Sequence, residues 1–463
     1  MKFFGRQNEL AELDKAYKSN KFEFTVIYGR RRVGKTYLIQ KYIEDKDNIY
    51  YMASQTGDLN LERLSILVNE KMGFGNNGPI YKDYFTLFQA IGRLAQEKKM
   101  VFVIDEYPYL AESEKGISSI IQAMCDHDWK DTKLHLILCG SSMSFMEKQV
   151  LSVKSPLYGR RTSQIKLNPF TFFETKEFLM GMDKEDIAVI HSVTGGIAEY
   201  ISFVDKNLSL DDNLINLFFN PSGRLFEEPI NLLNQELKSP EVYNQIIYAI
   251  ANGASKNVDI SDKTSIPSGS LSSYLTNLID LGIIKKETPY GKNGGRKTIY
   301  RIKDGCFRFY YRYVLRFQSQ IAVYQGEKIY GEFVKEDLPN FMGESFEEIS
   351  YEFFECINKE SKLPGYVLSY GRWWGNNPIE KQEEEIDLLG EGKNFSIFGE
   401  FKWRNRDFQI KELEKLIYKS KFSPVNHSNS YYLLITKKKF SDEVKKAINE
   451  NEKILGFTFE DDF

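Results

Sequence analysis

Short apolar runs and helical periods alternate along the first third of the chain. Residues 24–28 (FTVIY), 100–105 (MVFVID) and 134–139 (LHLILC) are continuous hydrophobic runs, and helical spacing follows the first of them. Uninterrupted runs of this length, rich in β-branched and aromatic side chains, are typical of strands buried on both faces. The pattern therefore predicts an α/β domain with a parallel sheet.

The pattern changes near Pro240. Residues 241–251 and 269–281 have helical spacing, and the second of these helices is expected to stop at Gly282 before a strand. The stretch TPYGKNGGRKTIYRI (288–302) then predicts a β-hairpin with a Gly-rich tip. Helix, helix and hairpin in this order predict a winged helix-turn-helix.

The last third begins with an amphipathic helix over residues 341–357 and a strand over residues 366–374. The stretch EEEIDLLGEGKNFSIFGEFKW (383–403) predicts two strands around a Gly-containing turn, and a helix (409–420) and a strand (430–436) follow. This α-β-β-β-α-β order is that of the restriction-endonuclease-like core.

Composition narrows the class of protein. At 463 residues and 42% hydrophobic content, the chain is long enough for several domains with real cores. Its formal net charge of −3 gives no global basic field, so any nucleic-acid contact must use local patches. The four widely spaced cysteines and four histidines argue against zinc fingers and disulfide frameworks. We expect a cytoplasmic protein without a membrane span, because no apolar run approaches the required length.

The segment GRRRVGKT (29–36) follows the first apolar run and precedes a helical pattern. Strand, G-x-x-x-x-G-K-T loop and helix is the P-loop arrangement, in which the glycines let backbone N–H groups surround phosphate oxygens. Lys35 supplies a point charge to the β- and γ-phosphates, and the Thr36 hydroxyl ligates Mg²⁺. The expected nucleotide-binding residues here are Gly29, Arg30, Arg31, Arg32, Val33, Gly34, Lys35, Thr36 and Tyr37.

Polar residues end the next two apolar runs. Asp105 is expected to hold the Mg²⁺ shell and Glu106 to polarise the attacking water; a strand that ends in two acids by chance is the weaker alternative. Ser141 is expected either to sense the γ-phosphate or to cap a helix. Of Arg160 and Arg161, one is expected to act as an arginine finger on a neighbouring subunit's nucleotide, with an ordinary salt bridge as an equal alternative.

The segments FFGRQNEL, GRRRVGKT, VIDEYPYL, LILCGSSMSFM and SPLYGRRT occur in this order. Together they resemble the prokaryotic AAA-like P-loop ATPases of the archaeal-type ATPase family, which are related to the signal-transduction ATPases with numerous domains (STAND). The resemblance covers the first half of the chain. It implies that Phe4, Gly5 and Arg6 lie near the adenine and that TGGIAEYI is the helical-lid box. That box often carries Pro where this chain has Ala198.

The predicted winged helix has polar candidates for nucleic-acid contact. They are Ser270, Ser272, Ser273 and Asn277 on the recognition helix, and Lys292, Arg296 and Lys297 on the wing. Short polar side chains and a basic wing suit a duplex, through the major groove and the phosphates. In the alternative, which carries equal weight, the winged helix packs on its own ATPase domain.

Strand alternation assembles a candidate metal site on the C-terminal hairpin. Glu400 and Lys402 are two positions apart and share a face, and Asp387 lies across the ladder on the preceding strand. Two carboxylates and the backbone carbonyl of Phe401 make an oxygen site suited to Mg²⁺. Lys402 would orient or deprotonate a water and offset charge on a scissile phosphate. Glu347 on the preceding helix is a further acid for the site.

This set resembles the PD-(D/E)xK nuclease superfamily, and in detail the C-terminal domain of unknown function often fused to archaeal-type ATPases. The candidate Asp387 follows Ile386 instead of Pro. The motif is loose in a chain with 27% charged residues, so an intact nuclease and a degenerate domain that binds DNA or a partner are both open.

We therefore expect an α/β multidomain protein. The expected parts are a P-loop NTPase core (1–165), a helical lid (166–238), a winged helix-turn-helix (239–318), a linker (319–340) and a restriction-endonuclease-like α/β domain (341–463). The leading hypothesis is an ATP-hydrolysing ATPase coupled to a DNA-binding winged helix and a Mg²⁺-dependent nuclease-like domain. ATP and Mg²⁺ are its cofactors and DNA its partner, with a homo-oligomer as an open option. The rivals are a STAND-like signalling switch with an inactive C-terminal interaction module, and a transcription regulator that uses only the winged helix.

Overall fold

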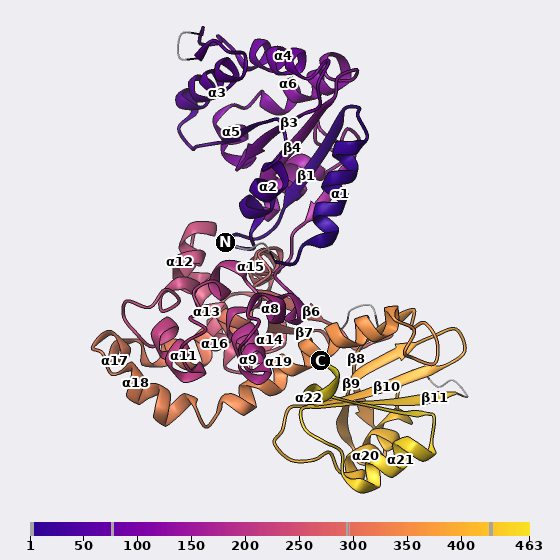
Figure 1. The fold of residues 1–463 in the computed structure, drawn as a ribbon. Coiled ribbons are helices and arrows are strands. Elements are labelled where there is room, and N and C mark those ends of the chain that lie inside the picture. Colours follow the sequence, from indigo (N-terminus) through magenta and orange to yellow (C-terminus); the bar gives the residue numbers. More distant parts are fainter. Residues whose placement is uncertain (1–3, 76–77, 293–294, 296, 426–428) are drawn as a thin grey trace. The chain divides into compact units, whose positions relative to one another are not determined.

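The chain forms two compact units in a computed structural model that describes residues 4–75, 78–292, 295, 297–425 and 429–463 (Figure 1). The first unit comprises residues 1–170 and 197–199, and the second comprises residues 171–196 and 200–463. Across the described residues, no helix is both long and apolar enough to cross a membrane.

The first unit is built on a five-stranded sheet that is parallel throughout, in the order β2-β3-β4-β1-β5. The strands are β1 (Glu23–Tyr28), β2 (Asn48–Met52), β3 (Met100–Asp105), β4 (Leu134–Gly140) and β5 (Ser163–Lys166). Every residue of β1, β3 and β4 is buried, as expected for strands covered on both faces. These are the three apolar runs of the sequence, and the predicted parallel α/β domain is confirmed.

Helices connect these strands, and Figure 1 draws them in indigo and purple. They are α1 (Gln7–Lys18), α2 (Lys35–Ile43), α3 (Gly57–Lys71), α4 (Tyr84–Leu94), α5 (Tyr107–Ser113), α6 (Ile117–Ala123) and α7 (Met143–Phe145). The core between α4 and the sheet contains Trp129, whose indole donates a hydrogen bond to the Phe88 carbonyl at 3.0 Å. A Cβ on Gly92 of α4 would come within 2.8 Å of that indole, so the ring and the helix fit only because position 92 is glycine.

The second unit starts with helices and a small hairpin. The helices are α8 (Phe172–Phe178), α9 (Lys184–Thr194), α10 (Ala198–Ile201, shared with the first unit), α11 (Leu210–Phe218), α12 (Glu228–Glu236), α13 (Pro240–Ala251), α14 (Asn257–Thr264) and α15 (Ser268–Asp280). The hairpin pairs β6 (Ile284–Glu287) with β7 (Ile299–Ile302) in antiparallel register, with Ile284 opposite Ile302. Helices α16 (Gly305–Phe309), α17 (Gln318–Ala322) and α18 (Gly326–Ile329) follow.

The C-terminal part of the second unit contains a mixed five-stranded sheet in the order β12-β11-β10-β9-β8. Its elements are α19 (Leu338–Lys359), β8 (Ser369–Asn377), β9 (Gln382–Glu391), β10 (Ser396–Lys402), α20 (Ile410–Ser420), β11 (Ser430–Thr436), α21 (Asp442–Glu450), β12 (Ile454–Thr458) and α22 (Phe459–Asp462). Strands β8, β9 and β10 are antiparallel neighbours, whereas β10, β11 and β12 run parallel. The first six elements follow the α-β-β-β-α-β order expected from the sequence.

A buried histidine in the first unit makes its stability depend on pH. His135 of β4 has no exposed surface, and its two ring nitrogens lie 2.8 Å from the Thr25 hydroxyl and 2.9 Å from the Tyr42 hydroxyl. Burial lowers the pKa of His135 to about 3. At a pH below the ordinary histidine pKa of about 6.5, His135 therefore binds a proton in the unfolded chain but stays neutral in the folded chain. The stabilising contribution is complete above that pH and is lost as the pH falls from there toward 3.

We predict that this histidine lowers the free energy of unfolding by about 1.4 kcal/mol for each pH unit below 6.5. Urea unfolding of the wild type and of His135→Gln, measured between pH 7.5 and 5, gives the two slopes. The variant is expected to be less stable at pH 7.5 and to lose less stability on acidification. Parallel pH dependences would contradict the prediction.

Candidate functional site

The loop between β1 and α2 has the backbone shape of a phosphate cradle. It runs from Gly29 to Gly34, and Gly34 is the N-cap residue of α2 with a φ of 95°, where L side chains are strained. A Cβ on Gly29 would lie 2.3 Å from the Leu167 carbonyl oxygen, so that position also requires glycine. Backbone N–H groups at the start of α2 give this loop a positive end that suits phosphate.

The predicted P-loop lysine, Lys35, is the first residue of α2, and its side chain extends back into this loop. The Nζ atom of Lys35 donates to the carbonyl oxygens of Gly29 and Arg30, both at 2.9 Å. Lys35 is buried, and burial lowers the pKa of its ammonium group. Burial disfavours the charged form of Lys35, and the negative charge of a polyphosphate would favour it. The residues therefore fit the expected nucleotide.

Asp105 at the end of β3 is held by two hydroxyl groups. The Thr36 hydroxyl and the Tyr50 hydroxyl both donate to Oδ2 of Asp105 at 2.8 Å. The sequence prediction paired Thr36 with Asp105, and the structure brings them together. It missed Tyr50, which comes from β2, the neighbour of β3 in the sheet. Only the sheet order brings Tyr50 to Asp105, because 55 residues separate them. A hydroxyl and a carboxylate are ligands that suit Mg²⁺.

Glu106 and Ser141 meet at the ends of adjacent strands β3 and β4. Glu106 adopts the left-handed conformation, with a φ of 51°, which is uncommon for a residue with a side chain. Its Oε2 atom accepts hydrogen bonds from the Ser141 hydroxyl at 2.9 Å and from the Ser141 N–H at 3.4 Å. Ser141 thus contacts the carboxylate of the candidate catalytic residue Glu106, and it is Ser142 that occupies the N-cap position of α7.

The N-terminal box supports the P-loop backbone. Gly5 and Arg6 both have positive φ, and the buried guanidinium of Arg6 donates to the carbonyl oxygens of Val33 at 3.3 Å and Asn168 at 2.6 Å. On the loop itself, the Arg32 carbonyl accepts from the Glu199 N–H at 3.2 Å. The expected proximity of Gly5 and Arg6 to an adenine stays a prediction.

The remaining predicted nucleotide-site residues make contacts of other kinds. Arg31 donates to the Tyr109 hydroxyl at 3.2 Å, and Tyr37 on α2 is 43% exposed. Arg160 forms a two-fold ion pair with Asp126, at 2.8 and 2.7 Å. Arg161 donates to the Leu151 carbonyl at 3.5 Å. For Arg160 the structure shows the salt-bridge alternative within the chain; the role of either arginine as a finger stays a prediction.

The C-terminal candidates converge where β9 and β10 stop pairing. The last pair of their ladder is Gly399 with Leu388, one position before Glu400 and Asp387. Beyond it, the Phe401 N–H donates to Oδ2 of Asp387 at 2.8 Å. The Nζ atom of Lys402 lies 2.6 Å from Glu400 and 3.5 Å from Asp387, so one ammonium group bridges both carboxylates. Lys419 of α20, which the sequence prediction missed, contacts Glu400 at 3.4 Å.

Helix α19 adds further groups to this site. The Tyr351 hydroxyl donates to the Asp387 carbonyl at 2.5 Å, and Glu347 lies one turn earlier on the same helix. Burial and the nearby Asp387 raise the pKa of Glu347 to about 8, and they also raise the pKa of Glu400. A divalent cation would relieve this crowding of carboxyl groups.

The donor set limits which ion fits. Among the described residues, no group of three or more His, Cys, Asp and Glu side chains is arranged to hold a metal. The expected ligands are two carboxylates, Asp387 and Glu400, with a backbone carbonyl. Mg²⁺ commonly uses one or two carboxylates and keeps several waters, so these residues fit Mg²⁺ and do not suit a caged metal.

Part of the expected DNA surface makes contacts within the chain. Ser270, Ser272 and Ser273 on and around α15 are exposed. Asn277, however, donates to the Tyr243 hydroxyl of α13 at 2.7 Å, so it is engaged inside the helical group. Lys297 contacts Glu383 at 3.2 Å and Asn376 at 3.3 Å, on the C-terminal sheet. Lys292 is exposed, and Arg296 lies outside the described residues.

Comparisons with known protein families match two separate segments of the chain. Residues 3–204 match a family described as an ATPase domain predominantly from Archaea, and residues 310–416 match a family of archaeal and bacterial proteins of unknown function. An uncharacterized protein of Methanocaldococcus jannaschii is 33% identical over 456 residues, which cover 95% of this chain and 97% of that protein.

Solved structures resemble the chain at lower identity. The Walker-type ATPase of Pyrococcus abyssi is 20% identical with a TM-score of 0.50, over 67% of this chain and 96% of that chain. The ORC2 protein of Aeropyrum pernix, solved in ADPNP and ADP complexes, is 14% identical with a TM-score of 0.43, over 69% of this chain and 94% of that chain. The first likeness indicates the same ATPase fold.

We predict that Tyr50→Phe weakens the nucleotide site without unfolding it. Removing the phenol hydroxyl leaves Asp105 with a single hydroxyl donor, so its carboxylate is less firmly oriented. The Mg²⁺ concentration for half-maximal ATP turnover is expected to rise about three- to tenfold, which corresponds to about 0.7–1.4 kcal/mol, the net contribution of a typical hydrogen bond. Steady-state hydrolysis at graded Mg²⁺ measures this shift.

Tyr51→Phe is the matched control, because the adjacent side chain points to the opposite face of β2 and its hydroxyl bonds to Asn60. This variant removes the same atom and is expected to keep the wild-type Mg²⁺ dependence. Equal Mg²⁺ dependences for both variants would show that Tyr50 does not support Asp105.

Proposed function

This chain belongs to the archaeal-type P-loop ATPase family, and we propose that it hydrolyses ATP to control a Mg²⁺-dependent DNA-cutting site in its C-terminal domain. The bond between Thr36 and Asp105 supports the first half of the proposal, because it joins the P-loop to the end of β3. The convergence of Asp387, Glu400 and Lys402 supports the second half.

The groups of the first unit divide the work of ATP hydrolysis. Lys35 and the N–H groups of the loop bind the phosphates, and Thr36 with Asp105 would hold Mg²⁺. Bound Mg²⁺ supplies positive charge to the β- and γ-phosphates. Glu106 orients the attacking water and accepts its proton as the bond to the γ-phosphorus forms and ADP leaves. Ser141 fixes the carboxylate of Glu106 for this task.

The C-terminal site would cut a phosphodiester with a similar division of roles between metal ligands and a residue that orients water. Asp387 and Glu400 would hold Mg²⁺, which supplies Lewis acidity to the scissile phosphate. Lys402 lies against both carboxylates, and it would orient the attacking water and offset charge on the phosphate. The exposed serines of α15 and the exposed Lys292 are the remaining candidates for holding duplex DNA.

A cytoplasmic site of action is part of the proposal and rests on the wide spacing of the four cysteines in the sequence. A homo-oligomer, in which Arg160 or Arg161 reaches a neighbouring nucleotide, remains part of the hypothesis.

A second candidate function, a STAND-like switch, is favoured by one observation. Lys297 of the predicted wing is paired with Glu383 of the same chain and is therefore partly withdrawn from solvent. In that version the C-terminal domain is an interaction module whose docking follows the nucleotide state, and no DNA is cut.

We predict that Lys35→Ala abolishes ATP turnover, because the phosphates lose their buried positive charge. Glu106→Gln is expected to bind ATP normally and to hydrolyse it at least about 100-fold more slowly, since it removes the base and leaves the phosphate contacts. Phosphate release and fluorescent-nucleotide binding measure the two effects.

Lys41→Ala is the control on the same helix, because Lys41 is exposed and pairs only with Glu44 among the ion pairs found. It should hydrolyse ATP at the wild-type rate. Undiminished turnover by Lys35→Ala would remove the P-loop assignment.

For the C-terminal site, Glu400→Ala and Lys402→Ala are each expected to reduce Mg²⁺-dependent cleavage of plasmid DNA at least about 100-fold. Glu400→Ala removes an expected Mg²⁺ ligand, and Lys402→Ala removes the ammonium group beside that ligand. Gel analysis of supercoiled, nicked and linear forms, with and without ATP, follows the reaction.

Glu414→Ala and Lys415→Ala change exposed charges of the same types on α20 and should cut normally. A wild-type protein that leaves single- and double-stranded DNA and RNA intact under all metal and nucleotide conditions would reject the nuclease and favour the switch.

A further inference from the structure

The β6–β7 hairpin is docked on the C-terminal sheet. The Tyr290 N–H, just after β6, donates to the Arg372 carbonyl of β8 at 2.9 Å. The Tyr290 hydroxyl contacts Ser369 at 2.5 Å and Glu391 at 2.7 Å, and its ring packs against the hydrophobic core of that sheet. This aromatic side chain fixes the hairpin to the domain that carries the candidate metal site.

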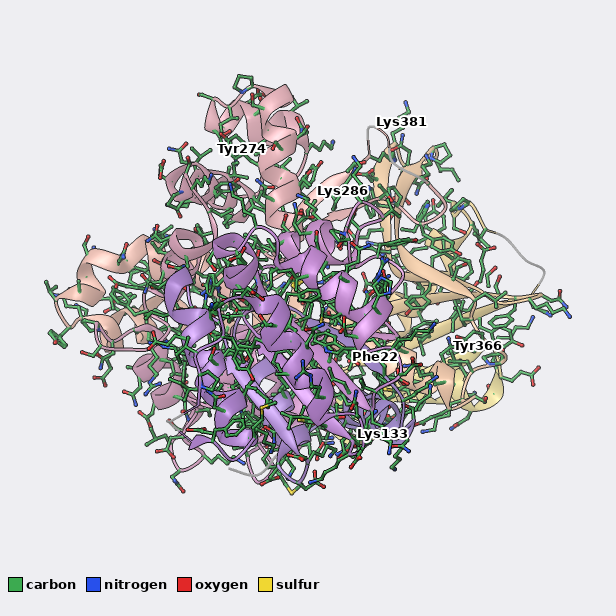
Figure 2. All side chains as sticks on the ribbon, turned by 90° about the horizontal axis from the view of Figure 1, so that it is seen from above. Phe22, Lys133, Tyr274, Lys286, Tyr366 and Lys381 are labelled. Carbon is green, nitrogen blue, oxygen red and sulfur yellow. The ribbon has the colours of Figure 1, made fainter. Side chains whose placement is uncertain are left out.

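The two faces of the hairpin have different partners. Lys285 and Arg301 are opposite each other in the ladder, and both point to α19, where Lys285 lies 3.3 Å from Glu348 and Arg301 lies 2.9 Å from Glu344. Lys286, the next residue of β6, alternates to the other face and is exposed (Figure 2). The hairpin therefore presents a basic face to an acidic helix.

Arg301 also reaches the candidate metal site through one side chain. Its Nη1 atom lies 3.7 Å from Oε2 of Glu347. Glu347 is one helical turn before Tyr351, whose hydroxyl is bonded to the Asp387 backbone. The Arg301 guanidinium thus lies beside Glu347, and Glu347 is on the helix that contacts the ligand-bearing strand.

A second ion-pair chain connects the hairpin to the same strand. Glu287 of β6 lies 3.9 Å from Arg301 and 3.7 Å from Arg372 of β8. Arg372 in turn pairs with Glu385, two residues before Asp387 on β9. Two chains of charged groups, joined by the contact between Glu287 and Arg301, therefore run from the hairpin to the neighbourhood of Asp387.

We infer that the hairpin supports the C-terminal site, with Arg301 as a positioning residue that keeps the Glu347 carboxylate in place near Asp387 and Glu400. The inference deepens the proposed function and rests on it for the identity of the site. The physical reason is that a carboxylate near two others is repelled by them. The Arg301 guanidinium beside Glu347 offsets that repulsion by attraction and fixes the position of this carboxylate, and its contact with Glu344 in turn fixes the guanidinium.

This arrangement gives the hairpin a role other than that of a free wing. The Glu347 carboxylate stays in place near the two ligand carboxylates only while the hairpin is docked. A movement of the hairpin away from α19 would release Glu347 without touching Asp387, Glu400 or Lys402, and would weaken the ion site.

Arg301→Gln in the full-length chain tests the inference. Mn²⁺, used as a probe for the site, is expected to bind about tenfold more weakly to this variant by isothermal titration calorimetry, in line with the effect of removing a partner of a metal-site residue. Arg301→Lys should recover part of the affinity. In the DNA cleavage assay, kcat is expected to fall while KM for DNA stays unchanged, because the arginine acts through Glu347 and does not hold the substrate.

Two lysine variants separate positioning from docking. Lys285→Gln removes a cation from the same face of the hairpin, beside Arg301, but its partner on α19 is Glu348 instead of Glu347. Lys286→Gln removes one from the exposed face. Both should bind Mn²⁺ like the wild type. If Lys285→Gln bound Mn²⁺ as weakly as Arg301→Gln, the loss of affinity would come from general undocking of the hairpin and not from the position of Glu347. That result would overturn the inference.

The remaining outcomes separate this inference from the proposed function. Wild-type Mn²⁺ affinity and cleavage in Arg301→Gln would overturn the inference and leave the nuclease standing. Mn²⁺ binding that depends on Arg301, in a wild-type chain that cuts no nucleic acid, would overturn the nuclease and leave the inference standing. A Glu347→Gln protein in which Arg301→Gln causes no further loss of affinity supports the route through Glu347, and additive losses contradict it.

Discussion

The parallel pairing of β1, β4 and β3 is the constraint on which the nucleotide site depends. Parallel strands end at the same edge of a sheet, so the loops that follow them must lie side by side. The P-loop follows β1, Glu106 follows β3 and Ser141 follows β4. Thr36 can donate to Asp105, and Ser141 to Glu106, because the sheet order fixes these ends as neighbours.

The C-terminal site depends on the opposite feature, the place where pairing stops. An uninterrupted β9–β10 ladder would engage the Phe401 N–H with backbone; here it binds the Asp387 carboxylate. The register of β8 and β9 also shifts at this point, between Gly371 and Trp373. Irregularities of this kind redirect side chains, and they are common next to active sites. Asp387 and Glu400 can therefore meet at one lysine from two different strands.

Local periodicity explains which parts of the structure could be predicted from the sequence. Buried strands, the P-loop and the hairpin around residues 392–395 depend on neighbours within a few positions, so their patterns are visible along the chain. The proximity of Asp387 and Glu400 followed from period-2 alternation and a short turn. The pairing of Thr36 with Asp105 needed the additional knowledge that a P-loop and a second strand share an edge.

Contacts between distant segments could not be predicted in this way. Tyr50 looks like any strand tyrosine, and only the order of β2 and β3 brings its hydroxyl to Asp105. Asn277 and Lys297 are of residue types common on DNA-binding surfaces. In the structure, however, Asn277 bonds to Tyr243 and Lys297 to Glu383. Many acceptors can satisfy the same side-chain donor. The sequence alone therefore does not show which partner a polar side chain binds, and the folded structure is needed to identify it.

The chain path offers a physical route between the two sites. Residues 197–199 belong to the first unit, where the Glu199 N–H bonds to the P-loop at Arg32, but the residues on both sides of them belong to the second. Immediately before them, α9 abuts α16 so closely that a Cβ on Gly305 would overlap the Ser192 carbonyl oxygen. From α16, Arg308 donates to Ser345 on α19, the helix that carries Glu347. Under the proposed function, a change in the P-loop backbone would pass first to a covalent segment and then to tightly packed helices, which move as rigid bodies more readily than they deform. The hairpin and α19, rather than the metal ligands themselves, are therefore the elements through which we propose that the nucleotide state acts.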